Sequence, residues 1–220
     1  MFSYYRPMDP QPISVVSAIL RLSEKYQIDH LRDDTIFRLE SEFPSTLKAV
    51  DTRHAGCSIK LDCPAIIDAI KLAREAGVLF ILPFAFLQLA TMDTRMILKG
   101  DRRDNDTVAV LSREDQEICL LGRDALRLAQ ENDMFGWLGG PSPNCLTPHH
   151  CDRIKIGHGI QLWKPSCEDL RLVKWNETDW KTGLCGPCSG IGEKAYEEGR
   201  QLVWNKLPSF FGLPDWAELE

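Results

Sequence analysis

The stretch ISVVSAILRLSEKYQIDHLRDDTIFRLESEFPSTL, residues 13–47, decides the fold class of this 220-residue chain. Its apolar side chains recur every three or four residues, which is the spacing of one helix face and not the strict alternation of a β-strand. They are Val16, Ile19, Leu20, Ile28, Leu31, Leu39 and Phe43. A break near 27–29 and a stop at Pro44 divide the stretch into two helices, because proline cannot continue a helix. The sequence therefore predicts a mainly α-helical protein.

Two more helical segments follow this pair. Asp62 is a suitable N-cap, Pro64 suits the first turn, and Gly77 suits the end of the helix between them. The run LFILPFAFLQLA, residues 79–90, is apolar nearly all round. A helix without a polar face has to be covered on every side, so we expect this run deep in the core.

The charged segment KGDRRDNDTV lies within residues 99–111 and has no apolar periodicity. Such composition is typical of a loop. We therefore expect two helical units, residues 1–98 and 112–220, joined by this loop.

The second unit begins with another helix. Ser112 suits its N-cap, with Asp115 placed like the far member of a capping box. The residues expected on its inner face are Ile118, Leu121, Ala125 and Leu128. Helical patterns return at 166–180 and 192–207, and the apolar tail LPSFFGLPDW, residues 207–216, should fold back onto the helices.

Residues 136–159 are rich in Gly, Pro, Cys and His, and their pattern is too irregular for a helix or a long strand. Cys145 and Cys151 lie within this segment, and Cys185 and Cys188 bracket a Gly-Pro in the later sequence LCGPCSG. A Cys-x-x-Cys turn supplies half of a tetrahedral zinc site, and a second close pair supplies the other half. A segment that buries little apolar surface needs such an ion to order it. The sequence therefore predicts a structural zinc ion held by these four cysteines.

Other assignments of the cysteine-rich region remain open. His149 or His150 could replace Cys151 as a ligand, and Cys167 is a spare candidate. Alternatively, Cys145 and Cys151 are unlinked loop thiols.

The CGPC sequence is also the pattern of thioredoxin-like redox sites, so a thiol–disulfide protein using Cys185 and Cys188 is a second hypothesis. Such a site needs a hydrophobic strand that leads into the first cysteine. The preceding residues, WNETDWKTG, are polar, and residues 189–220 are too few to complete a sheet. The metal hypothesis is therefore favoured.

Two further hypotheses concern the same half of the chain. His149, His150, His158 and Asp152 are the residues available to a metal-dependent nuclease, which needs an ion with an open position and convergent carboxylates. The tryptophans could form an aromatic ligand-binding surface, although their context favours core positions. They are Trp163, Trp175, Trp180, Trp204 and Trp216.

Composition limits the class of partner. The formal net charge is −6, and no basic face that would bind phosphates stands out, so we expect no nucleic-acid partner. The first ten residues, MFSYYRPMDP, lack the pattern of a signal peptide, and the greasiest run is too short to span a bilayer. We therefore expect an intracellular protein without a membrane partner, whose eight cysteines are thiols or metal ligands.

The sequence SAILRLSEKYQIDHLRDDTIFRLESEFPSTL resembles the closing helices of BTB/POZ domains, especially those of mushroom-forming fungi, in which LRLSxKYxIxxLRxxAxxxLxxxFP recurs. The segments AIKLAREAGVLFILPFAFLQLA and LPSFFGLPDW look like the helical region and tail that follow in the same proteins. The chain has almost none of the α/β portion that begins a BTB domain. The resemblance implies a non-enzymatic adaptor with protein partners, a cullin ubiquitin ligase among them, and no catalytic residues.

Overall fold

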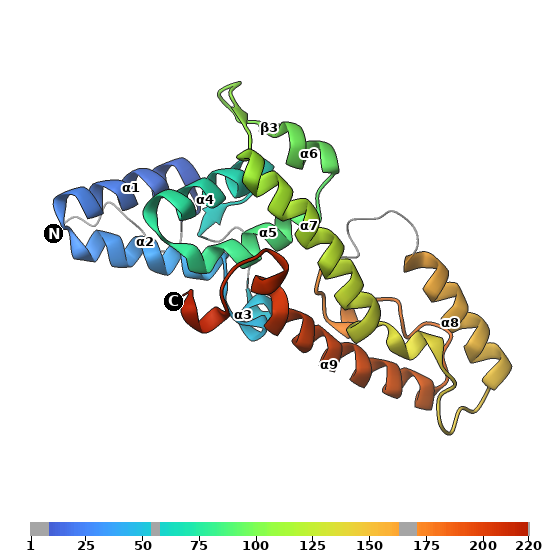
Figure 1. The fold of residues 1–220 in the computed structure, drawn as a ribbon. Coiled ribbons are helices and arrows are strands. Elements are labelled where there is room, and N and C mark those ends of the chain that lie inside the picture. The colour runs from blue at the N-terminus through green and yellow to red at the C-terminus, as the bar shows by residue number, and fades with distance from the viewer. Residues whose placement is uncertain (1–8, 54–57, 163–170, 220) are drawn as a thin grey trace.

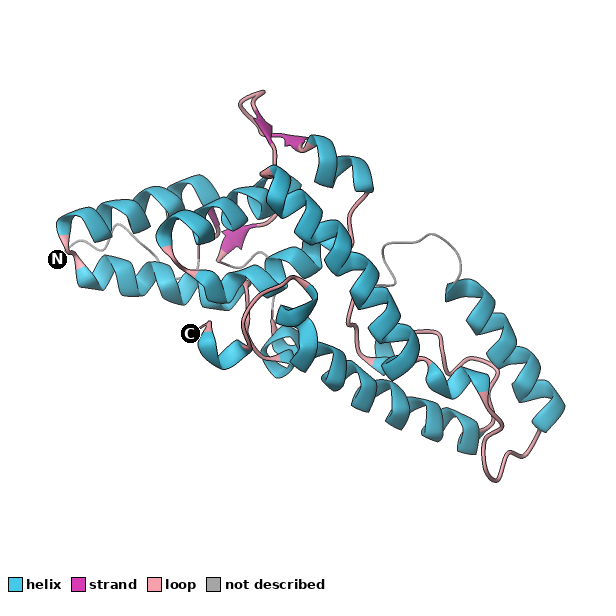
Figure 2. Ribbon diagram, in the orientation of Figure 1, coloured by secondary structure: helices cyan, strands magenta, loops and turns pink. Residues whose placement is uncertain are grey.

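The computed structural model describes residues 9–53, 58–162 and 171–219, and these are mainly helical, which confirms the predicted fold class (Figures 1 and 2). Helices α1, α2 and α4 lie at one end of an elongated molecule and α8 lies at the other (Figure 1). Helices α7 and α9 extend between these two ends. The long axis of the protein is therefore built by two helices that belong to the second half of the sequence.

The first two helices are α1 (Ile13–Tyr26) and α2 (Asp29–Glu42), as predicted. Gln27 ends α1 in the left-handed conformation, with φ of 53°, and its N–H donates to the carbonyl oxygen of Glu24. The turn lets the chain reverse after a single non-helical step. The apolar side chains of the two helices then face the same core.

The next segment also follows its sequence signals. After the short α3 (Leu47–Thr52), α4 (Cys63–Ala76) begins with the carboxylate of Asp62 accepting from the N–H of Ala65 at 2.8 Å. It ends at Gly77, whose φ of 69° a side chain would strain. The following 3₁₀ turn η1 (Leu79–Ile81) and α5 (Leu82–Ala90) are almost fully buried, which confirms the prediction for that run.

Residues 99–111 contain a hairpin and not only a loop. After α6 (Thr94–Lys99), β3 (Asp101–Arg102) pairs antiparallel with β4 (Val108–Ala109). Arg103 beside the turn donates to the carboxylate of Asp68 on α4 at 2.6 Å, so the hairpin lies against the first unit. A second small pairing joins β1 (Gln11–Pro12) in parallel to β2 (Ile59–Lys60).

Helix α7 (Arg113–Ala129) has the predicted N-terminus, because the Ser112 hydroxyl accepts from the N–H of Asp115 at 3.0 Å and donates to its carboxylate at 2.8 Å. Its predicted inner face was wrong in part. Leu121 and Leu128 are 63% and 59% exposed, whereas Cys119 and Leu126 are fully buried.

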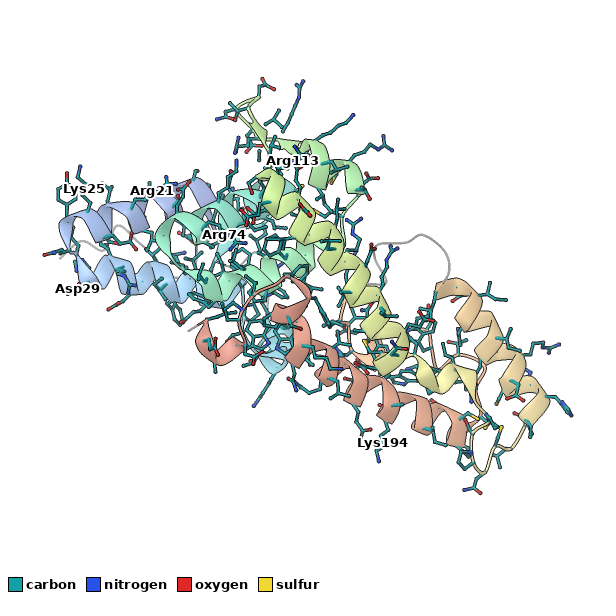
Figure 3. All side chains as sticks on the ribbon, viewed as in Figure 1. Arg21, Lys25, Asp29, Arg74, Arg113 and Lys194 are labelled. Atoms are coloured by element: carbon teal, nitrogen blue, oxygen red, sulfur yellow. The ribbon has the colours of Figure 1, made fainter. Side chains whose placement is uncertain are left out.

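Two contacts hold α7 with Cys119 and Leu126 facing the core. Arg74 on α4 lies beside the first turns of α7 (Figure 3) and donates to the carboxylate of Asp115 at 3.0 Å. Gly122 lies directly against the ring of Phe211, where a Cβ would be only 2.2 Å away. The leucine spacing is also helical, so the sequence pattern could not choose between the faces.

The cysteine-rich region contains a helix that we did not predict. Helix α8 (Pro148–Leu162) occupies part of the segment expected to be irregular. Its buried residues are Cys151 and Lys155, and its isoleucines Ile156 and Ile160 are exposed. A helix whose inner face is a thiol and an ammonium has no apolar stripe, so periodicity could not detect it.

The rest of the second unit surrounds the long helix α9. The remaining elements are the π-helical turn η2 (Gln130–Met134), the 3₁₀ turns η3 (Gly136–Gly139), η5 (Trp175–Glu177) and η6 (Trp216–Glu218), and α9 (Gly186–Phe210). The predicted helix at 192–207 is confirmed as part of α9. Of the helix expected at 166–180, residues 163–170 lie outside the described part of the chain, and 171–180 form only a 3₁₀ turn and bends.

Buried polar contacts join the two halves. Arg200 on α9 is 2% exposed and pairs with the carboxylates of Asp51 and Glu197. The tail folds back as predicted, since Trp216 stacks on Trp204 with ring centroids 5.3 Å apart. Side chains from both halves belong to one hydrophobic cluster. In the part of the chain that the structure describes, no helix is long and apolar enough to cross a membrane.

Candidate metal centre

The four predicted cysteine ligands converge. The sulfur atoms of Cys145, Cys151, Cys185 and Cys188 all lie within 4.8 Å of one another. Two come from the loop and first turn at the start of α8, and two come from the residue before α9 and its first turn. The cluster therefore connects two segments, residues 145–151 and 185–188, that are far apart in the sequence. It is compatible with a bound metal ion.

Local backbone structure presents each sulfur. In the first pair, a turn closed by the N–H of Cys145 to the carbonyl oxygen of Ser142 at 3.3 Å leads into α8. The Cys151 N–H then donates to the carbonyl oxygen of Thr147 at 2.9 Å, which is the first bond of that helix. In the second pair, Pro187 occupies the first turn of α9, where its missing N–H costs nothing.

The cysteines of the cluster are free thiols. The sulfurs of Cys145 and Cys185 lie 3.7 Å apart. A disulfide requires about 2.05 Å. The arrangement is therefore a set of separate thiols and not a bridged pair.

Hydrogen-bond donors surround two of the sulfurs and favour their ionised form. The pKa of Cys151 is lowered by the hydroxyl of Thr147, 3.3 Å away, and by the N–H of Cys185, which donates at 3.4 Å. The pKa of Cys185 is lowered to about 6, first by the N–H of Cys188 and then by that of Leu146. Hydrogen bonds to a thiolate stabilise its charge. The surroundings of these two sulfurs therefore favour the thiolate form.

The other two sulfurs have the opposite tendency. Burial raises the pKa of Cys145 to about 12 and also raises the pKa of Cys188. Four thiolates at this spacing disfavour one another's charge unless a cation lies between them. The cluster can carry four negative sulfurs only with a positive ion at its centre.

A buried lysine is connected to the cluster by hydrogen bonds, and the sequence analysis did not predict it. Lys155 is 2% exposed, and its ammonium group donates to the carbonyl oxygen of Gly140 at 2.7 Å and to the hydroxyl of Ser142 at 2.8 Å. That hydroxyl in turn donates to the sulfur of Cys188 and lowers its pKa. Among the described residues Lys155 pairs with no carboxylate, and its link to the cluster runs through the hydroxyl of Ser142. Its position four residues after Cys151, on the same helix face, was the available signal.

The alternative ligands lie elsewhere. His149, His150 and Asp152 are exposed on α8, and His158 lies farther along it against the ring of Trp180. The structure does not bring these residues into the cysteine cluster, which is the one metal-compatible group found in the part of the chain that it describes. Cys167 and Trp163 lie outside the described residues.

Two cysteines are buried singly. Burial raises the pKa of Cys63 to about 11 and that of Cys119 to about 12. Of the other tryptophans considered, Trp175 and Trp204 are buried, while Trp180 and Trp216 are partly exposed at the edge of the core. The aromatic residues therefore act largely as packing.

Comparison of the chain with models of known protein families, with curated proteins and with solved structures gives no match.

Proposed function

We propose that this chain is a non-enzymatic protein-interaction module whose C-terminal unit is held together by a structural zinc ion on Cys145, Cys151, Cys185 and Cys188. The observation that supports the zinc is the convergence of the four sulfurs within 4.8 Å. Zinc binds thiolates at about 2.3 Å in a tetrahedron, whose edges are then about 3.8 Å long. The 3.7 Å between the sulfurs of Cys145 and Cys185 agrees with such an edge.

The ligand set favours a structural role. Four thiolates fill all the positions of a tetrahedral ion, so substrate and water have no place to bind. Soft sulfur ligands also select zinc or iron over magnesium or calcium. The loop before α8 buries little apolar surface and gains its order from the ion.

The adaptor role rests on the resemblance of residues 17–47 to the end of a BTB domain. Helices α1 and α2 from this stretch also leave large apolar side chains open to solvent, among them Tyr26 and Phe37, which are 62% and 64% exposed. Such side chains are available to a protein partner. Docking onto a cullin ligase is part of this proposal by resemblance, and an intracellular location agrees with free thiols.

One observation favours a second candidate, a thiol–disulfide protein. Cys185 directly precedes α9, and its pKa is lowered to about 6, as in the attacking cysteine of a redox pair. Two observations weigh against it. In the described residues no strand leads into Cys185, and two more sulfurs lie beside the pair.

The deciding experiment measures the metal content of the purified protein by mass spectrometry together with a thiol count before and after chelation. We expect about one zinc per chain and four thiols released by the chelator. Cys188→Ser should lose the zinc and unfold the C-terminal unit, while the matched control Cys63→Ser, outside the cluster, should keep it. Iron in place of zinc, or no metal with rapid alkylation of Cys185, would contradict the zinc assignment, and the latter result would support the redox alternative.

A further inference from the structure

A cavity lies outside the cysteine cluster, between α8, the bends before α9, and α9 itself. Its volume is about 440 Å³, within the range of ligand pockets. Three aromatic side chains line it, from Phe135, Trp180 and Tyr196. Two carboxylates, of Glu177 and Asp179, lie at the same cavity. No step of the proposed structural role uses these groups.

The rings pack edge to face and not in a stack. The planes of His158 and Trp180 meet at 79°, with centroids 5.1 Å apart. Those of Trp180 and Phe135 meet at 63° and 5.2 Å, and those of Phe135 and Tyr196 at 62° and 5.8 Å. Each ring therefore packs edge to face against the next, and of the three that line the cavity Trp180 is the one that is partly exposed. The face of an aromatic ring carries partial negative charge and attracts cations.

The polar groups of the cavity also favour a positively charged ligand. Glu177 and Asp179 are exposed carboxylates, and Arg171 is the one lysine or arginine among the described residues that line the cavity. The Nε2 atom of His158 is buried and has no hydrogen-bond partner in the described structure. Among its described lining residues, the cavity thus has two carboxylates, one guanidinium group and one unfilled hydrogen-bonding position.

We propose that this cavity binds a methylated ammonium group, such as the side chain of a methylated lysine on a partner protein. Methyl groups can be buried against the rings, while the charge that they surround interacts with the ring faces and the two carboxylates. An unmodified ammonium group is more strongly hydrated and gives up its water reluctantly. This inference names the partner chemistry of the interaction module and therefore rests on that proposed function.

The cysteine cluster supports the cavity. Cys151 and His158 are on the same helix, α8, and Cys185 follows Trp180 after a short turn. An ion bound to both cysteines fixes the two walls relative to each other. Removal of the metal should therefore weaken binding in the cavity without changing any residue that lines it.

The test is calorimetric titration of the zinc-loaded full chain with four forms of one lysine peptide, which carry zero, one, two or three methyl groups, and with tetramethylammonium chloride. We expect at least tenfold tighter binding of a methylated form than of the unmodified peptide. Trp180→Ala and the double variant Glu177→Gln/Asp179→Asn should each weaken that binding about tenfold. The matched control is Glu193→Gln/Glu198→Gln, which removes the same charge from the exposed side of α9 that carries Lys194 in Figure 3.

The peptides and tetramethylammonium distinguish two possible sources of the ligand, and the zinc content shows which of the two proposals fails. Preference for a methylated peptide assigns the cavity to a partner protein, whereas binding of tetramethylammonium alone assigns it to a small quaternary amine. Equal affinity for all peptides without tetramethylammonium binding, or an unchanged affinity in the double variant, overturns the inference. Zinc content is measured on the same samples. If a protein with one zinc binds none of these compounds, only the proposed ligand of the cavity is refuted. A protein without zinc refutes the structural site.

Discussion

Replacement of Gly199 by alanine tests the packing that joins α9 to the turn η2. A Cβ at this position would lie 2.0 Å from the carbonyl oxygen of Asp133 and 2.7 Å from the Cα of Met134. Both atoms belong to the backbone, so no side chain can rotate away. Because ordinary contact begins at 3.4 Å, the two segments would have to separate by about 1.4 Å.

The expected loss of stability follows from two opposing effects. Overpacking a close contact costs about 1–3 kcal/mol, and more when backbone has to move. Alanine in a helix gains about 1 kcal/mol over glycine. We therefore expect Gly199→Ala to lower the free energy of unfolding by about 2 kcal/mol and the melting temperature by about 4–8 °C for a chain of this size.

Urea and thermal unfolding followed by circular dichroism measure this change. Gly190→Ala is the matched control, because Gly190 is exposed on the same helix and its Cβ would meet nothing within 4 Å. The control should gain up to about 1 kcal/mol. If Gly199→Ala is as stable as the original protein, α9 and η2 are not in backbone contact and the described packing is wrong.

Three other substitutions test the buried charges and thiols. Lys155→Met should weaken zinc binding about 10- to 100-fold in competition with a chromogenic chelator, because it removes the hydrogen bond that positions the Ser142 hydroxyl beside the sulfur of Cys188; an unchanged affinity would show that Lys155 has no influence on the site. Asp51→Ala should cost about 2–4 kcal/mol in urea unfolding, since Arg200 loses one of its two carboxylate partners, and a loss below about 1 kcal/mol would contradict this role. The pKa of Cys119 is raised to about 12, so the unfolded state alone releases this proton between pH 9 and 12 and stability falls there by up to about 1.4 kcal/mol per pH unit. Cys119→Ala should have a shallower decline in unfolding free energy over the same pH range, and an equal slope in both proteins would exclude this thiol as its source.

The helices that the sequence predicted are those whose signals are local. The caps at Asp62 and Ser112 and the end at Gly77 depend on groups within three or four residues of one another, so the backbone satisfies them before any tertiary contact forms. The apolar stripes of α1 and α2 act in the same way. Ligand chemistry is equally local, because a Cys-x-x-Cys turn brings two sulfurs together whatever surrounds it.

Helix α8 and the inner face of α7 needed tertiary information. The buried side chains of α8 are Cys151 and Lys155. They face inward only because they interact with groups of other segments: Lys155 with the carbonyl oxygen of Gly140, and Cys151 with the N–H of Cys185. On α7, two sets of residues have helical spacing. The close approach of Gly122 to Phe211, over almost ninety residues of chain, selects the set that faces inward.

The sequence by itself determined that the chain is helical and which cysteines are candidate metal ligands, because both follow from residue type and short spacing. Only the tertiary structure decided that the two cysteine pairs meet, that Lys155 bonds to the hydroxyl of Ser142, and that Trp180 and Phe135 border one cavity. These groups come from separate segments. Their distances depend on how α8 and α9 pack, and that packing is the sum of many weak contacts that no short pattern encodes.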